Sequence, residues 1–208
     1  MRVKRVGEDH FVKREIAGVA PSIILTRPKY AHNVGSALRS ASCYGFKQVW
    51  FTGDRIGIDP DKGDRLPREE RMKGYTEVDL IASDRPFDRL PKGAVPVAIE
   101  INPGAQQLPQ FEHPENAVYV FGPEDGGVDR VTMGLCHHVV MIPTAHCLNL
   151  GNAVSTVLYD RLLKEQAKDP SRVLPTASYL NEVREIGVGD LYDRKGVWMG
   201  SNAEHRPR

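Results

Sequence analysis

The sequence predicts an α/β protein with a mainly parallel sheet and flanking helices. Short runs of β-branched and aromatic residues alternate along the chain with segments of helical periodicity, as in parallel α/β folds. The 208 residues, 40% of them hydrophobic, suffice for one packed domain with extensions. In a sheet of this kind, ligand chemistry is expected at the carboxyl ends of the strands.

Six segments are expected as strands, because each is a short apolar run and most of them end at a glycine or a proline. They span residues 22–26, 47–52, 75–81, 94–101, 117–121 and 138–142. Pro96 predicts an irregular or edge start for the fourth strand, since proline cannot donate a hydrogen bond to a strand ladder.

The first expected helix follows residues 22–26. Asn33 can cap it, its apolar residues recur at helical spacing, and Gly45 suits the C′ position that ends it. Arg39 lies off the apolar stripe of this helix. We therefore expect Arg39 to point away from the core, toward whatever lies over the end of the strand.

Two further helices are expected after residue 127. One surrounds Val128, Val131 and Leu135. The other, at 149–168, is the longest clear helix in the sequence, and its charged residues lie mostly outside the apolar stripe. This pattern also places Arg161 outside the stripe.

Both ends of the chain differ in composition from the core. Residues 1–20 are expected as a locally basic N-terminal arm, either a solvated tail or a phosphate-contacting segment. Residues 21–168 form the expected domain. Residues 169–208 keep aromatic and aliphatic side chains, so they are expected to dock on the core or on a second subunit. The charged segment 54–73 is expected as a long loop or a short exposed helix.

The counts of charged residues and cysteines argue against a strongly basic protein and against secretion. Lysine and arginine number 28 against 27 acidic residues, a net charge of +1, so any polyanion site is a local patch. The odd number of cysteines, 3, favours a reducing compartment, and the cytoplasm is the expected location. The sequence has no signal-peptide pattern and no run of about 18 apolar residues, so membrane insertion is not expected.

Sulfur and imidazole side chains gather between residues 136 and 147. We expect no metal site there, because the neighbours His137 and His138 would point to opposite faces of a strand and no second spaced pair completes a ligand set. The nucleotide signatures G-x-G-x-x-G and G-x-x-x-x-G-K-[ST] are missing from the sequence. Hydride transfer and phosphate transfer are therefore disfavoured.

Three stretches carry the chemistry of the chain. They are N-V-G-S-A-L-R at 33–39, F-G-P-E-D-G-G at 121–127, and I-P at 142–143 with L-N-L-G-N-A-V at 148–154. They follow the first, fifth and sixth expected strands, where a parallel sheet binds ligands. In the second stretch, the glycines let the backbone approach a bound group closely.

Together these stretches resemble the three motifs of the SpoU/TrmH family of RNA 2′-O-methyltransferases, in the SPOUT superfamily, over about residues 21–165. The F-G-P-E turn and the N-L-x-N-x-V helix start are most similar to the TrmL-like tRNA enzymes. The resemblance implies a C-terminal trefoil knot that binds S-adenosylmethionine, and an obligate homodimer whose active site draws on both subunits. It also implies an RNA substrate, tRNA first and rRNA second.

The resemblance assigns roles to single residues as well. Arg39 would be the catalytic arginine near the ribose 2′-hydroxyl, with Asn33 shaping its loop and Glu124 holding or polarising it. The cofactor pocket would be formed by Glu100, Ile101, Phe121, Gly122, Ile142, Cys147, Leu148 and Asn149. Because a guanidinium stays protonated in proteins, we expect Arg39 to stabilise the developing alkoxide and to anchor phosphate or ribose, with the base role left open.

The third stretch departs from the family pattern. Its segment between Ile-Pro and Leu-Asn is shortened to residues 144–147, and Cys147 stands where the family commonly has serine. Two alternatives therefore stay open beside the RNA 2′-O-methyltransferase. One is a noncatalytic RNA-binding protein that kept the knot fold, and the other is a knotted methyltransferase that acts on a base or a small molecule.

Overall fold

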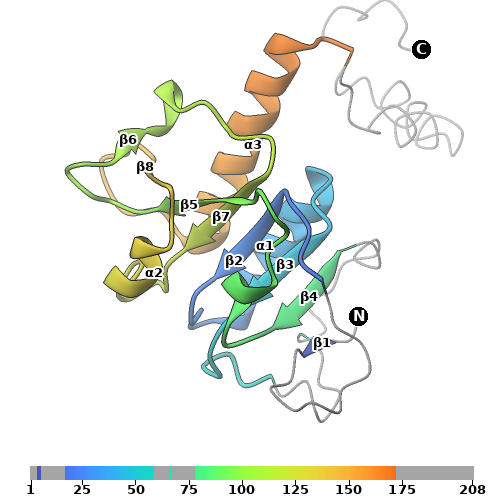
Figure 1. Ribbon diagram of the computed structural model, residues 1–208. Coiled ribbons are helices and arrows are strands. Elements are labelled where there is room, and N and C mark those ends of the chain that lie inside the picture. Colours follow the sequence, from blue (N-terminus) through green and yellow to red (C-terminus); the bar gives the residue numbers. More distant parts are fainter. Residues whose placement is uncertain (1–3, 6–16, 59–65, 67–77, 172–208) are drawn as a thin grey trace, which may run out of the picture. The chain divides into compact units, whose positions relative to one another are not determined.

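A parallel sheet forms the centre of the described part of the chain. The computed structural model describes residues 4–5, 17–58, 66 and 78–171. Strands among these residues pair in parallel, in the order β1-β4-β3-β2-β7-β5-β8-β6 (Figure 1). The chain divides into two compact units, Met1–Lys164 and Glu165–Arg208, and the sheet belongs to the first.

The elements follow one another in α/β order. The strands are β1 (Lys4–Arg5), β2 (Ser22–Leu25), β3 (Gln48–Phe51), β4 (Asp79–Ala82), β5 (Val95–Ile99), β6 (Gln106–Gln107), β7 (Ala117–Phe121) and β8 (His138–Met141). The helices are α1 (Ala31–Cys43), α2 (Arg130–Gly134) and α3 (Leu150–Lys168), with 3-10 turns η4 (Pro86–Arg89) and η5 (Leu108–Gln110). The α/β class with a parallel sheet is confirmed, and each expected strand has a counterpart, although residues 75–77 lie outside the described residues.

The expectation of an edge start at Pro96 is wrong. β5 lies inside the sheet, between β7 and β8. Pro96 is tolerated because it is the second residue of β5, and pairing with β8 begins only at Val97. The carbonyl of Pro96 still accepts a hydrogen bond from the backbone N–H of His137 at 2.8 Å.

Helix α1 begins earlier than its sequence predicts. Its N-cap is Tyr30, with no capping side chain, so Asn33 is not the cap but a buried residue of the first helical turn. The C-terminal prediction is confirmed: Gly45 has a φ of 79°. Its N–H bonds the Ser42 carbonyl, and the next N–H, of Phe46, bonds the Ala41 carbonyl, which is a Schellman motif.

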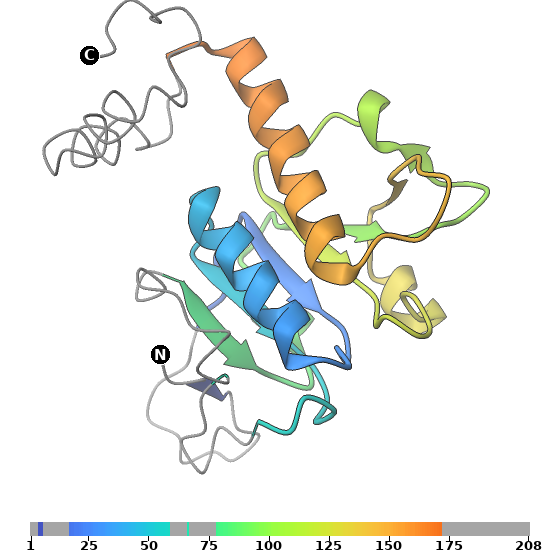
Figure 2. The same cartoon turned by 180° about the vertical axis from the view of Figure 1, so that it is seen from behind.

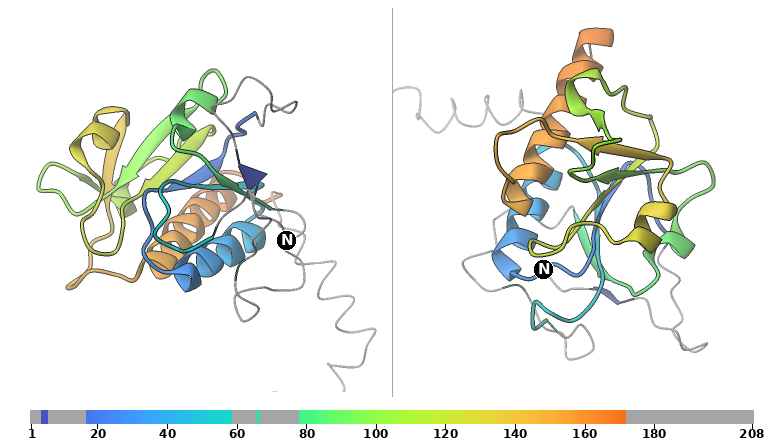
Figure 3. Two further views of the ribbon diagram at one scale, coloured as in Figure 1. Left: turned by 90° about the horizontal axis from the view of Figure 1, so that it is seen from below. Right: turned by 90° about the vertical axis from the view of Figure 1, so that its left-hand side faces the viewer.

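The two faces of the sheet carry different helices. Alternate residues of β2 point to opposite faces, so Ile23 and Leu25 pack in one cluster with α1 and α3, whereas Ile24 packs with Trp50 in another. Figure 2 shows α1 and α3 side by side on the first face. Figure 3 shows α2 and the η4 turn on the other.

Helix α2 lies where a helix is expected, but two of the three apolar residues that mark it in the sequence are exposed. Val128 is 6% exposed, but Val131 is 79% exposed and Leu135 is 51% exposed. The helix is a single short turn begun by Asp129, whose carboxylate accepts from the backbone N–H of Val131 and Thr132. It is too short to place successive apolar residues on one buried face.

Helix α3 contains a charged residue that the sequence places outside the apolar stripe. Arg161 is only 4% exposed. Its guanidinium donates to the carbonyls of Pro114 and Glu115, at 2.7 and 2.9 Å, and to the hydroxyl of Tyr119 at 3.2 Å. Hydrogen bonds to carbonyls that lie beneath the helix offset the desolvation of the cation.

Several expectations concern residues outside the described ranges. These are most of the arm at 1–20, most of the charged segment 54–73 and nearly all of 169–208. Among the residues that the structure does describe, no helix is long and apolar enough to cross a membrane. The same residues contain no cluster of three or more His, Cys, Asp or Glu side chains that could hold a metal ion.

Candidate cofactor and catalytic site

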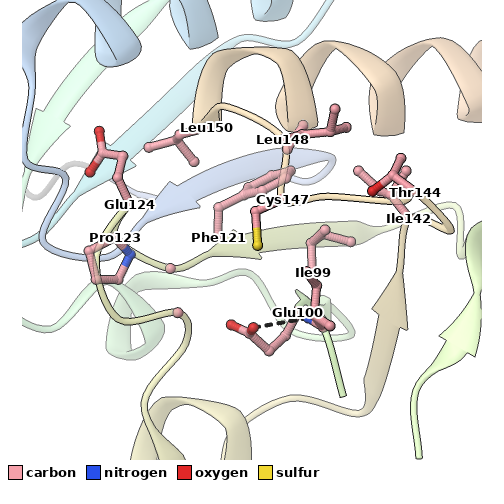
Figure 4. Close-up of a pocket in the computed structure, with 14 residues that line it drawn as sticks. Ile99, Glu100, Phe121, Pro123, Glu124, Ile142, Thr144, Cys147, Leu148 and Leu150 are labelled. Carbon is pink, nitrogen blue, oxygen red and sulfur yellow. Dashed lines mark hydrogen bonds between the residues drawn. The ribbon is translucent and has the colours of Figure 1, made fainter. Parts of the chain in front are cut away.

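A pocket of about 180 Å³ opens at the carboxyl edge of the sheet, where β5, β7 and β8 end and α3 begins (Figure 4). Its lining includes Glu100, Ile101, Phe121, Gly122, Ile142, Cys147 and Leu148. These are all of the residues expected in a cofactor pocket except Asn149. The second and third sequence stretches therefore meet in the pocket, because the carboxyl ends of parallel strands share one edge. The first stretch does not line the pocket and joins the other two beside it, through Asn33.

The glycine-rich turn after β7 forms one wall of the pocket. A Cβ on Gly122 would lie 2.1 Å from the carbonyl carbon of Gly127 and 2.4 Å from the backbone nitrogen of Val128. Gly127 itself has a φ of 66°, which favours glycine. The turn therefore folds back on its own backbone, and no side chain fits at either position.

Glu100, at the end of β5, ties this turn to the sheet. Its carboxylate accepts a hydrogen bond from the backbone N–H of Ile101 at 2.9 Å and another from the backbone N–H of Val128. A Cβ on Gly127 would lie 2.5 Å from the same carboxylate. Glu100 therefore both lines the pocket and fixes the shape of its wall.

A chain of hydrogen bonds links the three sequence stretches beside the pocket. Glu124 accepts from the side-chain amide of Asn33, and Asn33 accepts from the side-chain amide of Asn149 at 2.9 Å. The oxygen of Asn149 accepts from the backbone N–H of Gly151 at 2.9 Å, as an N-cap of α3. Because a carboxylate stands at one end and an N–H at the other, the orientation of both amides is fixed.

Glu124 is an ionised carboxylate at neutral pH. Partial burial raises the pKa of this carboxyl, but hydrogen bonds from the Asn33 amide and the Lys29 backbone N–H outweigh burial, so the net pKa lies below its usual value. The Lys29 N–H donates to Glu124 Oε2 at 2.7 Å. Glu124 thus presents a fixed negative charge at the mouth of the pocket.

Helices α1 and α3 approach closely beside this chain. A Cβ on Gly151 would lie 2.5 Å from the Cβ of Ser36. Small residues on both helices therefore let Asn149, at the start of α3, reach Asn33 on α1. Side-chain size at 151 sets the distance between two of the three stretches.

Arg39 is not held by Glu124. The two oxygens of Glu124 accept from Asn33 and Lys29 instead. Arg39 is exposed on α1, as its position off the apolar stripe predicts. Within residues 17–58 and 78–171, its side chain has no hydrogen bond or ion pair. Its guanidinium is therefore turned toward solvent in the single chain.

The shortened third-motif loop reaches the pocket. Thr144 and Cys147 both line it, and in Figure 4 the Cys147 thiol points into the space between Phe121 and Ile99. Cys147 is a free cysteine with an exposed side chain. The loop thus contributes a thiol and a hydroxyl to a wall that is otherwise mostly apolar.

Sequence reasoning did not predict a cluster of charges beside Glu124. Arg55 donates to both carboxylate oxygens of Asp125, at 2.9 and 2.6 Å, and the Lys29 ammonium lies 3.3 Å from the same carboxylate. The Arg55 guanidinium, more than Lys29, holds the pKa of Asp125 far below its usual value. Since these residues come from three separate loops, no pattern within one stretch of sequence signals the cluster.

The fold and the pocket define a parallel α/β protein with a ligand site at the carboxyl edge of its sheet. The model of the SpoU rRNA Methylase family matches residues 20–159 of this chain. The chain therefore belongs to the SpoU rRNA Methylase family.

Two curated relatives agree with this membership. The chain is 30% identical over 156 residues to the tRNA (cytidine-2'-O-)-methyltransferase TrmJ of Methanocaldococcus jannaschii, a match that covers 69% of this chain and 68% of TrmJ. It is 26% identical to the 23S rRNA (guanosine-2'-O-)-methyltransferase RlmB of Coxiella burnetii, over 72% of this chain and 60% of RlmB.

Solved structures share the fold. One, described as structural insights into the 2-OH methylation of C/U34 on tRNA, has a TM-score of 0.58 at 23% identity and covers 70% of this chain and 90% of that one. Another is the SpoU methyltransferase AviRb from Streptomyces viridochromogenes in complex with AdoMet, with a TM-score of 0.58 at 20% identity. That match covers 73% of this chain and 60% of AviRb. At these identities the likeness establishes the fold.

Proposed function

We propose that this chain transfers a methyl group to the ribose 2′-hydroxyl of tRNA at the pocket beside Glu124. As a member of its family, it is an S-adenosylmethionine-dependent RNA 2′-O-methyltransferase. The observation that carries the proposed site is the hydrogen-bond chain from Glu124 through Asn33 to Asn149. Similarity to the tRNA enzyme TrmJ favours tRNA, and similarity to RlmB makes rRNA the second substrate to test.

The residues of the pocket fit S-adenosylmethionine. Apolar side chains of Ile99, Ile142 and Leu148 offer walls for a planar base and an aliphatic chain. The space left by Gly122 brings backbone groups close to a bound molecule, and the Glu100 carboxylate has lone pairs for hydroxyl donors. When bound, S-adenosylmethionine supplies an activated methyl group on a sulfonium.

The residues around the pocket mainly align the ribose and stabilise charge. The 2′-hydroxyl loses its proton to water as its oxygen attacks, so a negative charge develops on that oxygen. The family resemblance implies an active site that draws on both subunits. We therefore assign the stabilisation of this charge to Arg39, which is exposed in the single chain and is a poor base. Asn33 and Glu124, locked to each other, hold the loop that leads into α1. Alignment of the reacting atoms is the largest contribution that such a site offers.

We also propose that the chain forms a homodimer with a knotted C-terminal part, as the family resemblance implies. An exposed apolar surface on α3 supports a second subunit, because Tyr159 is 55% exposed and Leu163 is 53% exposed. The ring of Tyr44 lies 6.5 Å from that of Tyr159 and extends this surface. Multi-angle light scattering of the wild type and of Tyr159→Glu tests the proposal, since we expect a dimer and a monomer respectively.

The cytoplasm remains our proposed location. Within the described ranges, Cys43, Cys136 and Cys147 are all free, which suits a reducing compartment. Fractionation of the source cells with an antibody against the chain tests this, and recovery outside the cytoplasm would overturn it.

Two measurements test the proposed activity. Calorimetric titration with S-adenosylmethionine is expected to give saturable binding, and no binding at millimolar cofactor would leave a noncatalytic RNA-binding protein. Mass spectrometry of nucleosides from tRNA and rRNA, after incubation with the chain and labelled cofactor, is expected to find the label on a ribose of tRNA. A label on a base would exclude 2′-O chemistry, and a label only in rRNA would exclude the tRNA assignment.

A further inference from the structure

A second groove, of about 410 Å³, lies on the other side of the glycine-rich turn 122–127. It opens between α2, the η4 turn and the loops that follow β2 and β3. Pro123 and Gly127 line both this groove and the cofactor pocket. The turn is therefore a wall shared by two hollows, of which the proposed function uses one.

The groove lies where the order of the strands reverses. From β2 the sheet continues to β3 and β4 on one side, and to β7, β5 and β8 on the other. In parallel α/β sheets, ligands bind outside the carboxyl ends of the strands at this switch point. Thr26 follows β2 and Pro123 follows β7, and both line the groove. The cofactor pocket lies instead at the ends of β5, β7 and β8, so the switch point is left for a different ligand.

Arg27 presents a cation to this groove from a strained backbone. Its φ is 46°, and it is the one non-glycine residue with positive φ in the described ranges. Its N–H donates to the Thr52 hydroxyl at 3.0 Å, and its carbonyl accepts from Arg55 at 3.4 Å. Glycine would adopt this conformation without strain, so an arginine at this position has a cost in backbone energy.

Arg27 is an exposed residue that lines the groove. Its guanidinium forms no hydrogen bond or ion pair with the described part of the chain. A strained backbone at a ligand site can hold a side chain in place. Here that side chain is the cationic one of Arg27, and no carboxylate of the described residues pairs with it. A phosphate is the anion that an arginine fork binds best.

The remaining lining suits a nucleobase. Val131 is 79% exposed and Leu135 is 51% exposed on the α2 side, and Phe87 lies on the η4 side. Apolar side chains beside a hollow mark ligand sites and offer a surface for a flat ring. Asp84, Arg85, Asp88 and Asp129 also line the groove. The Asp129 carboxylate accepts from Val131 and Thr132, so Asp84 and Asp88 are the carboxylates that match the N–H groups on a base edge.

We propose that this groove binds a nucleotide of the RNA substrate next to the methylated ribose, with Arg27 on its phosphate. The inference rests on the proposed RNA methyltransferase function and adds where the RNA is gripped. An RNA strand that crosses the shared wall at Pro123 has one nucleotide in the groove and the next beside Glu124, on the same turn. Arg27 then contacts the phosphate of one nucleotide. The apolar rim contacts the face of its base, and the carboxylates of Asp84 and Asp88 contact the edge of that base.

The first test compares Arg27→Gly with Lys92→Ala in a filter-binding assay with a bulk tRNA preparation. Lys92 is exposed in the turn before β5, at the opposite edge of the sheet, so its variant loses the same charge away from the groove. We expect Arg27→Gly to weaken tRNA binding about tenfold and to lower the salt slope by about 1. Its thermal midpoint should be unchanged or raised, because glycine removes the strain, and its affinity for S-adenosylmethionine should stay within about twofold of wild type.

The second test places a negative charge on the rim with Val131→Glu. Its matched control is Val19→Glu, because Val19 is 39% exposed before β2, at the amino edge of the sheet. We expect only the Val131 variant to lose tRNA affinity, by about tenfold or more, with both chains keeping the oligomeric state of wild type. A Val131→Glu chain that changes oligomeric state would make the groove a subunit contact and overturn the inference.

The outcomes separate this inference from the proposed function. If wild type binds and methylates tRNA while Arg27→Gly and Val131→Glu bind it within twofold of wild type, the groove assignment is wrong and the function stands. If wild type binds neither tRNA nor rRNA, both are wrong. Cross-links from 4-thiouridine-labelled tRNA to residues 84–88 or 131–135 would support the groove directly.

Discussion

The side-chain amide of Asn149 donates to the side-chain oxygen of Asn33 at 2.9 Å, across 116 residues of sequence. Asn149 caps α3 and Asn33 lies in the first turn of α1, so the bond joins the start of the last described helix to the start of the first. Asn33 in turn donates to Glu124. One buried amide thereby sets the relative positions of all three motifs.

The central place of Asn33 is tested by Asn33→Asp. The new carboxylate would face the ionised Glu124 instead of donating to it, so we expect a loss of about 2–3 kcal/mol of unfolding free energy at pH 7. Turnover should fall with it. Urea denaturation measures the first effect. Asn116→Asp is the control, since Asn116 is exposed and its variant adds the same charge. Equal stability of the two variants would contradict the role given to Asn33.

Arg39→Ala separates catalysis from cofactor binding. Arg39 does not line the pocket, so the affinity for S-adenosylmethionine should stay within about twofold of wild type by calorimetry. Loss of the charge that stabilises the alkoxide should lower kcat by about 10²–10³. Arg39→Lys, which keeps the charge and loses the fork, should recover part of that rate. A large loss of cofactor affinity in Arg39→Ala would show that its role is misassigned.

Gly122→Ala tests the folded-back turn. The added methyl would lie 2.1 Å from the Gly127 carbonyl carbon, so the turn must open. We expect a loss of about 2 kcal/mol or more in stability and a large fall in cofactor affinity. Gly126→Ala is the matched control, because the nearest atom to its added methyl is Pro123 Cγ at 3.8 Å. Equal cofactor affinity in the two variants would refute the close packing at Gly122.

The sequence predicts the sheet better than it predicts what covers the sheet. Strands such as β7 are fully buried, so their apolar runs identify them without knowledge of their neighbours. β6 consists of two exposed glutamines and has no such signal. Arg161 is misplaced because the carbonyls that it bonds come from a loop far away in the sequence. The sequence predicts a helix around Val131, and α2 is there, but this helix is too short to bury an apolar stripe and Val131 is 79% exposed.

The sequence motifs predict which residues line the candidate pocket, but not which of their side chains bond to one another. The resemblance brings Gly122, Cys147 and Leu148 to one pocket, and the structure has them there. It pairs Glu124 with Arg39, whereas the structure pairs Glu124 with Asn33. Which side chain bonds Glu124 depends on where α1 starts. No capping side chain marks that start, so the sequence does not locate it. Hydrogen bonds between side chains of separate loops depend on the three-dimensional fold, so residue spacing within one motif does not predict them.

A buried histidine at the other side of α3 makes stability depend on pH. His113 Nε2 lies 2.8 Å from the Asp160 carboxylate, and Nδ1 lies 2.6 Å from the hydroxyl of Tyr119. Tyr119 also accepts from Arg161, so its own proton goes to Nδ1 and the neutral ring donates through Nε2. A second proton on the ring would remove the acceptor that Nδ1 offers to the buried Tyr119 hydroxyl.

Burial lowers the pKa of His113, and the opposing attraction of Asp160 does not restore it. The folded pKa therefore lies below the unfolded value of about 6.5. Between these two values the unfolded chain binds more protons, so the unfolding free energy falls as the pH drops through this window. Above about pH 6.5 the contribution of His113 is constant. Urea denaturation at several pH values should give this slope for wild type, and His113→Gln should reduce it. An unchanged slope in His113→Gln would assign the acid sensitivity to other groups.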